Sequence, residues 1–144
     1  MSASAYVTSV WRLALILNDC LTKALKPVMR RYGITQSQAQ LLFSVHRDSD
    51  ATVGIIAQKL GLARTNVSAM CKKLAHMGFL KRKRCEEDER FVSVALTEVG
   101  RDAARIIEKR IEKVCQDQKN INLQEVEKML DTFSKISMLL TEEE

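Results

Sequence analysis

The chain has 144 residues, of which 46% are hydrophobic and 28% are charged. This length predicts one domain, or one domain with an appendage, and the apolar content is sufficient for a buried core. Long unstructured linkers are not expected, because the sequence holds one proline and five glycines.

The positive charge is concentrated in one third of the chain. The net charge is +5, and residues 51–85 contain no acidic residue. The basic residues of this stretch are Lys59, Arg64, Lys72, Lys73, Lys81, Arg82, Lys83 and Arg84. Such a cluster is typical of proteins that bind a polyanion, most simply nucleic acid. The alternative is a solvated basic surface that has no partner.

Residues 5–32 are predicted to form one long helix. Apolar residues, among them Val7, Val10 and Leu17, recur at spacings of three and four. Further apolar residues widen this face, and a helix of that kind needs partners on more than one side. The apolar run 13–17 is far too short to cross a membrane.

Residues 52–77 predict a helix-turn-helix. Thr35 and Gln38 form a capping-box pair that opens the preceding helix. A short helix capped by Thr52 ends at Gly61, and a second helix follows up to Gly78. The expected outward face of that second helix consists of Arg64, Thr65, Asn66, Ser68, Ala69, Lys72 and Lys73. Small polar side chains suit base edges in a major groove, and lysines suit phosphates.

The period of the apolar residues changes from helical to two after Gly78. Residues 92–96 alternate as a strand does, and residues 79–84 are the expected partner strand. A basic hairpin directly after a recognition helix makes a winged helix, in which Lys81, Arg82, Lys83 and Arg84 would follow the DNA backbone. Arg90 could then enter a minor groove. The acids from Glu86 to Glu89 either pair with nearby bases or form an ordinary solvated turn.

Two further helices are predicted after the hairpin. Thr97 is the expected cap of the first, and Asn122 with Glu125 the expected cap of the second. Both helices carry an apolar face, and that of the second includes Val126 and Leu130.

Three stretches resemble the MarR family of bacterial transcriptional regulators: ITQSQAQLL, IIAQKLGLARTNVSAMCKKLAHMGFLKRKR and DERFVSVALTEVG. The last matches the family's wing pattern, D-x-R followed by V-x-L-T-x-x-G. The matching residues are Asp88, Arg90, Val94, Leu96, Thr97 and Gly100. One departure is Ala63, which stands where relatives commonly place a Ser or Thr to cap the recognition helix.

The resemblance implies a mainly α fold with a small β-hairpin, a winged helix-turn-helix flanked by dimerisation helices. The expected parts of this one intertwined domain are an N-terminal dimerisation helix (1–34), a DNA-binding lobe (35–97) and C-terminal dimerisation helices (98–144). The expected interface residues are Val7, Val10, Leu17, Val126, Leu130, Phe133 and Leu140. A homodimer would bind a pseudo-palindromic operator in double-stranded DNA, with Arg90 in the minor groove and Asp88 orienting it.

The resemblance also implies a repressor that leaves DNA when a small-molecule effector binds. Candidate residues for the effector pocket are Trp11, Met29, Tyr32, Phe43 and His46, each of which could instead be plain core. No catalytic set is visible, so an enzyme is not expected. Neither a metal site nor a cofactor is expected, since the two histidines are poorly placed to bind a metal.

The cysteines leave one alternative open. Cys20, Cys71, Cys85 and Cys115 form no CxxC pair, and scattered thiols favour a reducing cytoplasm. Cys85 stands between four bases and four acids, so a redox-sensing regulator that uses Cys85 is one alternative. Another is a winged helix that binds an acidic protein partner.

Overall fold

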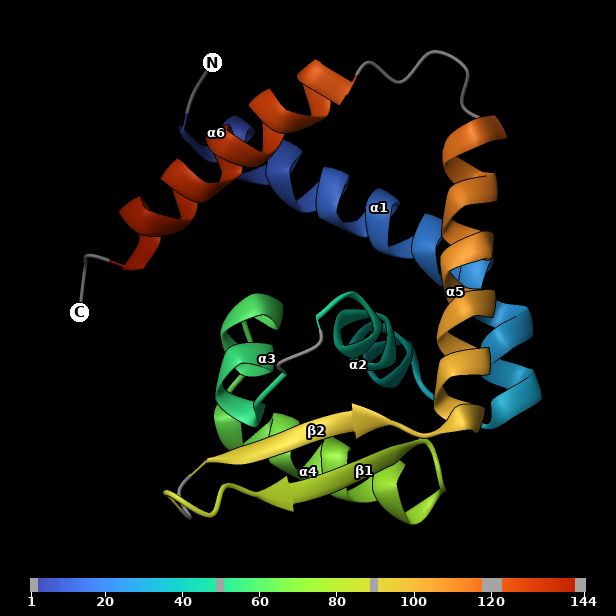
Figure 1. Cartoon of the computed structure of the whole chain (residues 1–144). Coiled ribbons are helices and arrows are strands. Elements are labelled where there is room, and N and C mark those ends of the chain that lie inside the picture. Colours follow the sequence, from blue (N-terminus) through green and yellow to red (C-terminus); the bar gives the residue numbers. More distant parts are fainter. Residues whose placement is uncertain (1–2, 49–50, 89–90, 118–122, 142–144) are drawn as a thin grey trace. The chain divides into compact units, whose positions relative to one another are not determined.

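A computed structural model describes residues 3–48, 51–88, 91–117 and 123–141. Its helices are α1 (Ala3–Tyr32), α2 (Gln36–Arg47), α3 (Val53–Leu60), α4 (Arg64–His76), α5 (Glu98–Asp117) and α6 (Leu123–Thr141). Strands β1 (Leu80–Arg84) and β2 (Val92–Leu96) form an antiparallel hairpin between α4 and α5 (Figure 1). The predicted mainly α fold with a small hairpin is therefore confirmed.

The chain divides into two compact units, Met1–Ile111 and Glu112–Glu144. The first contains the hydrophobic core, which α2, α3, α4, the hairpin and the ends of α1 and α5 nearest to them build together. Its fully buried side chains include Leu41, Leu42, Ile56, Val67, Cys71, Leu74 and Ile107. None of the helices in the described part of the chain is both long and apolar enough to span a membrane.

The predicted helix signals of the first unit are confirmed. The Thr35 side chain accepts a hydrogen bond from Gln38 N, and the Gln38 side chain accepts one from Thr35 N, so the capping box is complete. Thr52 caps α3 through Ile55 N, at 3.2 Å. Gly61 ends α3 with φ of 63°, a left-handed conformation that glycine adopts at low cost. Asn122, the predicted cap of α6, lies outside the described residues.

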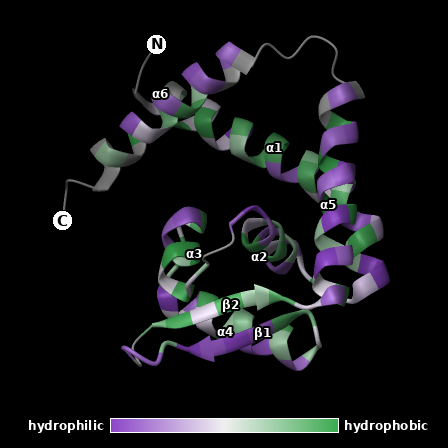
Figure 2. Cartoon of the chain, viewed as in Figure 1, coloured by the Kyte–Doolittle hydropathy of each residue, from purple (hydrophilic) through white to green (hydrophobic). Residues whose placement is uncertain are grey.

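The hairpin is joined to the start of α3 by a short third segment. Val94 N donates to Ala51 O at 2.9 Å, and Thr52 forms an isolated bridge with Ser93. Figure 2 shows β1 as hydrophilic, in keeping with its run of bases, beside a more hydrophobic β2. The wing is therefore fixed to the helix-turn-helix along one edge.

A large apolar surface of α1 is exposed in the single chain. Among the side chains of α1 that the structure describes, only those near α2 are buried in the core: Ala24, Leu25 and Val28. Trp11 and Leu15 are each 70% exposed. In α6, taken by itself, Leu130 is 62% exposed. Isolated exposed apolar residues are normal, but a run of them along one helix indicates an interaction surface.

Candidate nucleic-acid interface

Helix α4 presents a polar, acid-free face to solvent. Val67, Cys71 and Leu74 are fully buried and hold the helix on the core. All seven residues of the predicted outward face lie away from this buried stripe. Ser68 is half-buried, and Arg64, Thr65, Asn66, Ala69, Lys72 and Lys73 are exposed. The face carries three basic side chains with small polar ones between them, so it can approach a polyanion without burying a carboxylate.

The start of α4 lacks a side-chain cap. Ala63 occupies the N-cap position and makes no side-chain hydrogen bond, as the sequence departure predicted. Arg64 lies against α3 at this point, because a Cβ on Gly54 would be 3.7 Å from the guanidinium carbon of Arg64. The guanidinium is thereby placed beside the first turn of α3.

The hairpin register divides the basic run of β1 between two faces. Lys81 pairs with Ala95 and Lys83 with Ser93, whereas Arg82 pairs with Val94 and Arg84 with Val92. Successive side chains of a strand point to opposite faces. Lys81 and Lys83 therefore lie on the outer face of the wing, and Arg82 and Arg84 on the face of the buried Val94. The four bases do not form the single row along DNA that the sequence suggested.

Arg82 is partly buried on the inner face of the wing. Its Nε is buried and has no hydrogen-bond partner among the described residues. Burial raises the pKa of the Cys71 thiol from 9.0 to about 11, and the positive charge of Arg82 opposes this rise. Strand β1 packs against α4, and Arg82 lies on the same face of β1 as the buried Val94. Arg82 is thus on the side of the wing that faces the core.

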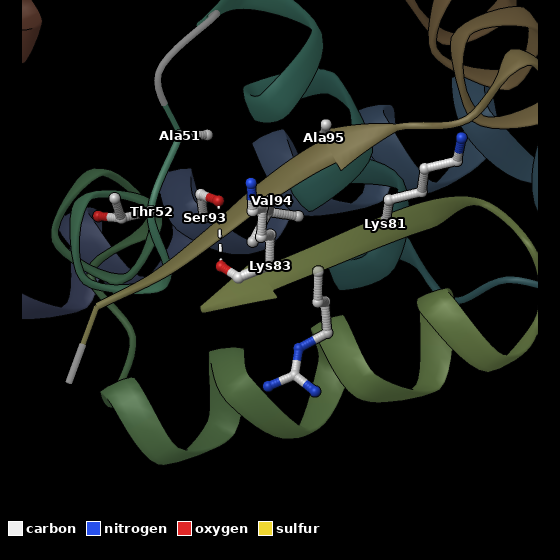
Figure 3. A pocket seen from close by; sticks show the side chains of 8 residues that line it. Ala51, Thr52, Lys81, Lys83, Ser93, Val94 and Ala95 are labelled. Atoms are coloured by element: carbon white, nitrogen blue, oxygen red, sulfur yellow. Dashed lines mark hydrogen bonds between the residues drawn. The ribbon is translucent and has the colours of Figure 1, made fainter. Parts of the chain in front are cut away.

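An open groove of about 670 Å³ runs along the wing beside the residues that precede α3 (Figure 3). Its residues share small or basic side chains: Ala51, Thr52, Lys81, Arg82, Lys83, Ser93, Val94 and Ala95. Ser93 Oγ donates to the carbonyl oxygen of Lys83 at 3.1 Å, the dashed line in Figure 3. Lys81 and Lys83 extend from β1, so positive charge covers this side of the wing as well.

The turn of the wing is closed by backbone hydrogen bonds. Cys85 N donates to Phe91 O at 2.8 Å, and Phe91 N donates to Asp88 O at 3.0 Å. One of the predicted pairs between turn acids and bases is present, Lys83 with Glu86 at 3.9 Å. Both side chains are largely exposed, so this pair contributes little to stability. Arg90, the predicted minor-groove residue, lies outside the described residues, and its role stays a prediction.

The predicted effector-pocket residues differ in burial, and their role stays a prediction. Met29, Tyr32 and Phe43 are half-buried and pack against the core, whereas Trp11 is exposed on α1. His46 lines a cavity of about 340 Å³ together with Val45, Asp48, Val94, Ala95, Leu96 and Arg101.

Glu108 of α5 binds both residues at the end of α2. His46 Nε2 lies 3.4 Å from Glu108 Oε2, and Arg47 Nη1 lies 3.3 Å from Glu108 Oε1. This contact, which the sequence alone did not indicate, fixes α2 to α5 beside the cavity lined by His46.

The free thiols differ in access. Cys20 and Cys85 are exposed and Cys71 is buried, while the side chain of Cys115 lies outside the described residues. Among the side chains that the structure describes, there is no group of three or more His, Cys, Asp or Glu that could hold a metal ion.

Residues 23–107 match the family model "Transcriptional regulator SarA/Rot". The chain belongs to this family. It is 35% identical over 80 residues to the organic hydroperoxide resistance transcriptional regulator of Bacillus subtilis, a match that covers 56% of this chain and 54% of that protein. It is 25% identical over 79 residues to the regulator SarZ of Staphylococcus epidermidis, covering 55% and 53%. The chain thus spans about half the length of these curated relatives.

Several solved structures have a similar fold, and each matches most of this chain. Reduced AbfR bound to DNA has a TM-score of 0.73 at 22% identity, covering 96% of this chain and 93% of that one. AbsC, a MarR family regulator from Streptomyces coelicolor, gives 0.72 at 17%, covering 97% and 96%. NadR in complex with 4-hydroxyphenylacetate gives 0.69 at 17%, covering 86% and 89%. The chain therefore has the fold of a MarR family regulator.

Proposed function

We propose that the protein is a double-stranded DNA-binding regulator of MarR type that acts in the bacterial cytoplasm. The observation that carries this proposal is the exposed, acid-free face of α4 beside a wing with four bases. In the proposed complex α4 lies in a major groove, with Arg64 and Asn66 near base edges and Lys72 and Lys73 near phosphates. Lys81, Lys83 and Arg84 contact the backbone, and Arg90 enters the minor groove.

We further propose that two copies assemble through α1 and α6. Val7 is 42% exposed, Leu17 51% and Leu130 62%, while Val10 and Phe133 are half-buried. The side chains of Val126 and Leu140, the other predicted interface residues, lie outside the described residues. A two-fold dimer presents two recognition helices to a pseudo-palindromic operator. On this assignment, segments 1–34 and 98–144 supply the dimer interface and 35–97 the DNA-binding lobe.

In this proposal the regulator is a repressor that a small-molecule effector releases from DNA. The fold resembles that of NadR with its bound aromatic acid, and His46 lines a cavity between α2 and β2. A ligand there would contact β2, which the register ties to the basic strand β1. Binding could thereby change the position of the wing.

The proposal is tested by fluorescence anisotropy with the duplex upstream of the protein's own reading frame and a scrambled duplex, over a salt series. We expect a preference of about 10³-fold or more for the native duplex and a steep loss of affinity with salt. Weak, equal binding to both duplexes would mean that the basic surface binds polyanions without recognising this DNA sequence. No binding to either at low salt would favour the acidic protein partner.

Three variants assign the contacts. Arg64→Ala should weaken binding to the native duplex by about 1–3 kcal/mol, while Lys81→Ala should weaken both duplexes alike and reduce the salt slope by about one. Lys109→Ala, an exposed base on α5, serves as the control and should change neither. An equal loss for Arg64→Ala on both duplexes would contradict base readout by Arg64.

A second candidate function is redox sensing through Cys85. The thiol is exposed in the turn of the wing, and its backbone N–H is bonded to Phe91 O. Peroxide would convert the thiol to a sulfenic acid and release water. Peroxide should then release the wild-type protein from DNA but not Cys85→Ser. Release of both proteins would exclude Cys85 as the sensor.

A further inference from the structure

The recognition helix α4 ends in a tightly bonded turn. Gly78 has φ of 87°, and its N–H donates to Ala75 O at 3.1 Å. Phe79 N donates to Leu74 O at 2.9 Å. These two bonds form a Schellman motif, which satisfies carbonyl groups of the last helical turn. The carbonyl groups of Gly78 and Phe79 come after the helix and are free to bind other elements.

Thr97 binds both of these carbonyl groups from the start of α5. Its hydroxyl donates to Gly78 O at 2.6 Å, and its backbone N–H donates to Phe79 O at 3.0 Å. The same hydroxyl accepts a hydrogen bond from Gly100 N at 3.1 Å. One hydroxyl therefore caps α5 and ties it to the end of α4.

The contact between α5 and the end of α4 is unusually close. A Cβ on Gly100 would lie 2.0 Å from Phe79 O, so only glycine allows the first turn of α5 to rest on this carbonyl group. The Phe79 ring meets Tyr32 of α1 edge to face, with centroids 5.8 Å apart. The end of the recognition helix is thus held by α5 through its backbone and by α1 through its side chain.

We propose that Thr97 is a positioning residue, which fixes the orientation of α4 relative to α5 through its bond to Gly78. This inference rests on the proposed function, in which a dimer places two recognition helices on one operator. Because α5 belongs to the segment proposed to supply the dimer interface, the bond would fix the separation of the two copies of α4. The simpler role of Thr97 is to cap α5 alone.

Substitutions at Thr97 separate the two roles. Thr97→Asp keeps an acceptor for Gly100 N, and Asp is among the strongest N-caps, but an ionised carboxylate has no proton to donate to Gly78 O. Thr97→Ser keeps both bonds, and Thr97→Val loses both. Thr35→Val is the matched control, because it removes a similar cap from α2 without touching the end of α4.

The readout is the preferred spacing of the two half-sites. The wild-type protein first enriches a duplex from a random library, and each variant is then measured on that duplex and on duplexes one base pair longer or shorter between the half-sites. We expect the wild type, Thr97→Ser and Thr35→Val to prefer the enriched spacing by about tenfold, roughly the effect of one mismatched base pair. Thr97→Asp and Thr97→Val should lose this preference. The negative charge of Asp cannot by itself cause this loss of preference. Its repulsion of DNA would weaken binding to all three duplexes by the same factor.

Amide hydrogen exchange provides a readout that does not depend on DNA. The Phe79 amide should exchange about tenfold faster in Thr97→Asp than in the wild type, because local opening at this end of α4 becomes easier. It should be unchanged in Thr35→Val. Unchanged exchange, or an unchanged spacing preference in Thr97→Asp, would overturn the proposal. Failure of the wild type to enrich any duplex would instead contradict the proposed function, and the exchange experiment would still decide whether Thr97 holds α4.

Discussion

The substitution Gly100→Ala should destabilise the fold more than a methyl group at a helix start normally does. The new carbon would lie 2.0 Å from the carbonyl oxygen and 3.0 Å from the carbonyl carbon of Phe79. Both atoms belong to the backbone and cannot rotate away. The first turn of α5 must therefore shift, which also breaks the bond from Thr97 N to Phe79 O.

The size of the effect follows from three contributions. Overpacking costs about 1–3 kcal/mol and at times more. The lost hydrogen bond adds about 0.5–1.5 kcal/mol, and the better helix propensity of alanine returns up to about 1 kcal/mol. We expect the free energy of unfolding to fall by about 2–4 kcal/mol, toward the upper end because neither backbone atom can yield. The thermal midpoint should fall by roughly 5–15 °C.

Thermal unfolding followed by circular dichroism measures this effect, at one fixed protein concentration because a dimer's midpoint depends on concentration. Gly54→Ala is the matched control. Its added carbon would be 3.7 Å from the guanidinium of Arg64, an ordinary contact, so this change should be neutral or stabilise by up to about 1 kcal/mol. If Gly100→Ala unfolds no earlier than Gly54→Ala, the close approach of α5 to Phe79 is refuted.

Two further predictions concern the buried thiol and the exposed apolar surface. Because burial raises the pKa of Cys71 from 9.0 to about 11, the unfolded chain loses this proton first, and the free energy of unfolding should fall as pH rises from 9.0 to about 11. Urea titrations at several pH values should show this fall in the wild type and a smaller one in Cys71→Ala. The same dependence of the free energy of unfolding on pH in both proteins would contradict the prediction. Leu17→Asp and Leu130→Asp each place a charge on an exposed apolar surface. On the proposed assembly, sedimentation should show a dimer for the wild type and a monomer for each variant. A wild-type dimer unaffected by either change would exclude these surfaces from the interface.

Local signals in the sequence predicted most of the first unit. The capping box of Thr35 and Gln38, the stop at Gly61 and the alternation from Val92 to Leu96 each depend on neighbours within a few residues. Each of these signals therefore acts within the segment that carries it. The absence of a side-chain cap at Ala63 was predicted for the same reason.

Features that depend on distant segments were not predictable in this way. The sequence indicated that Thr97 caps a helix, but its bond to Gly78 joins residues 19 positions apart and depends on how α4 meets α5. The contact of Glu108 with His46 likewise joins α5 to α2. The pairing of β1 with β2 separates Lys83 from Arg84, although both are bases in one uninterrupted run. The one sequence signal for the contact between α4 and α5 is Gly100. A glycine in the first turn of a helix can mark a close approach of another backbone.

The register of the hairpin restricts the length of β1 more tightly than its charge. Exchange of lysine for arginine at Lys81 or Lys83 keeps a positive charge on the outer face of the wing. Insertion of one residue within β1 would instead move every later side chain to the opposite face. Arg82 would then leave the inner face of the wing, and a lysine would take its place. Among homologues, insertions in the wing should therefore fall in the turn between β1 and β2, or occur within the strands in pairs.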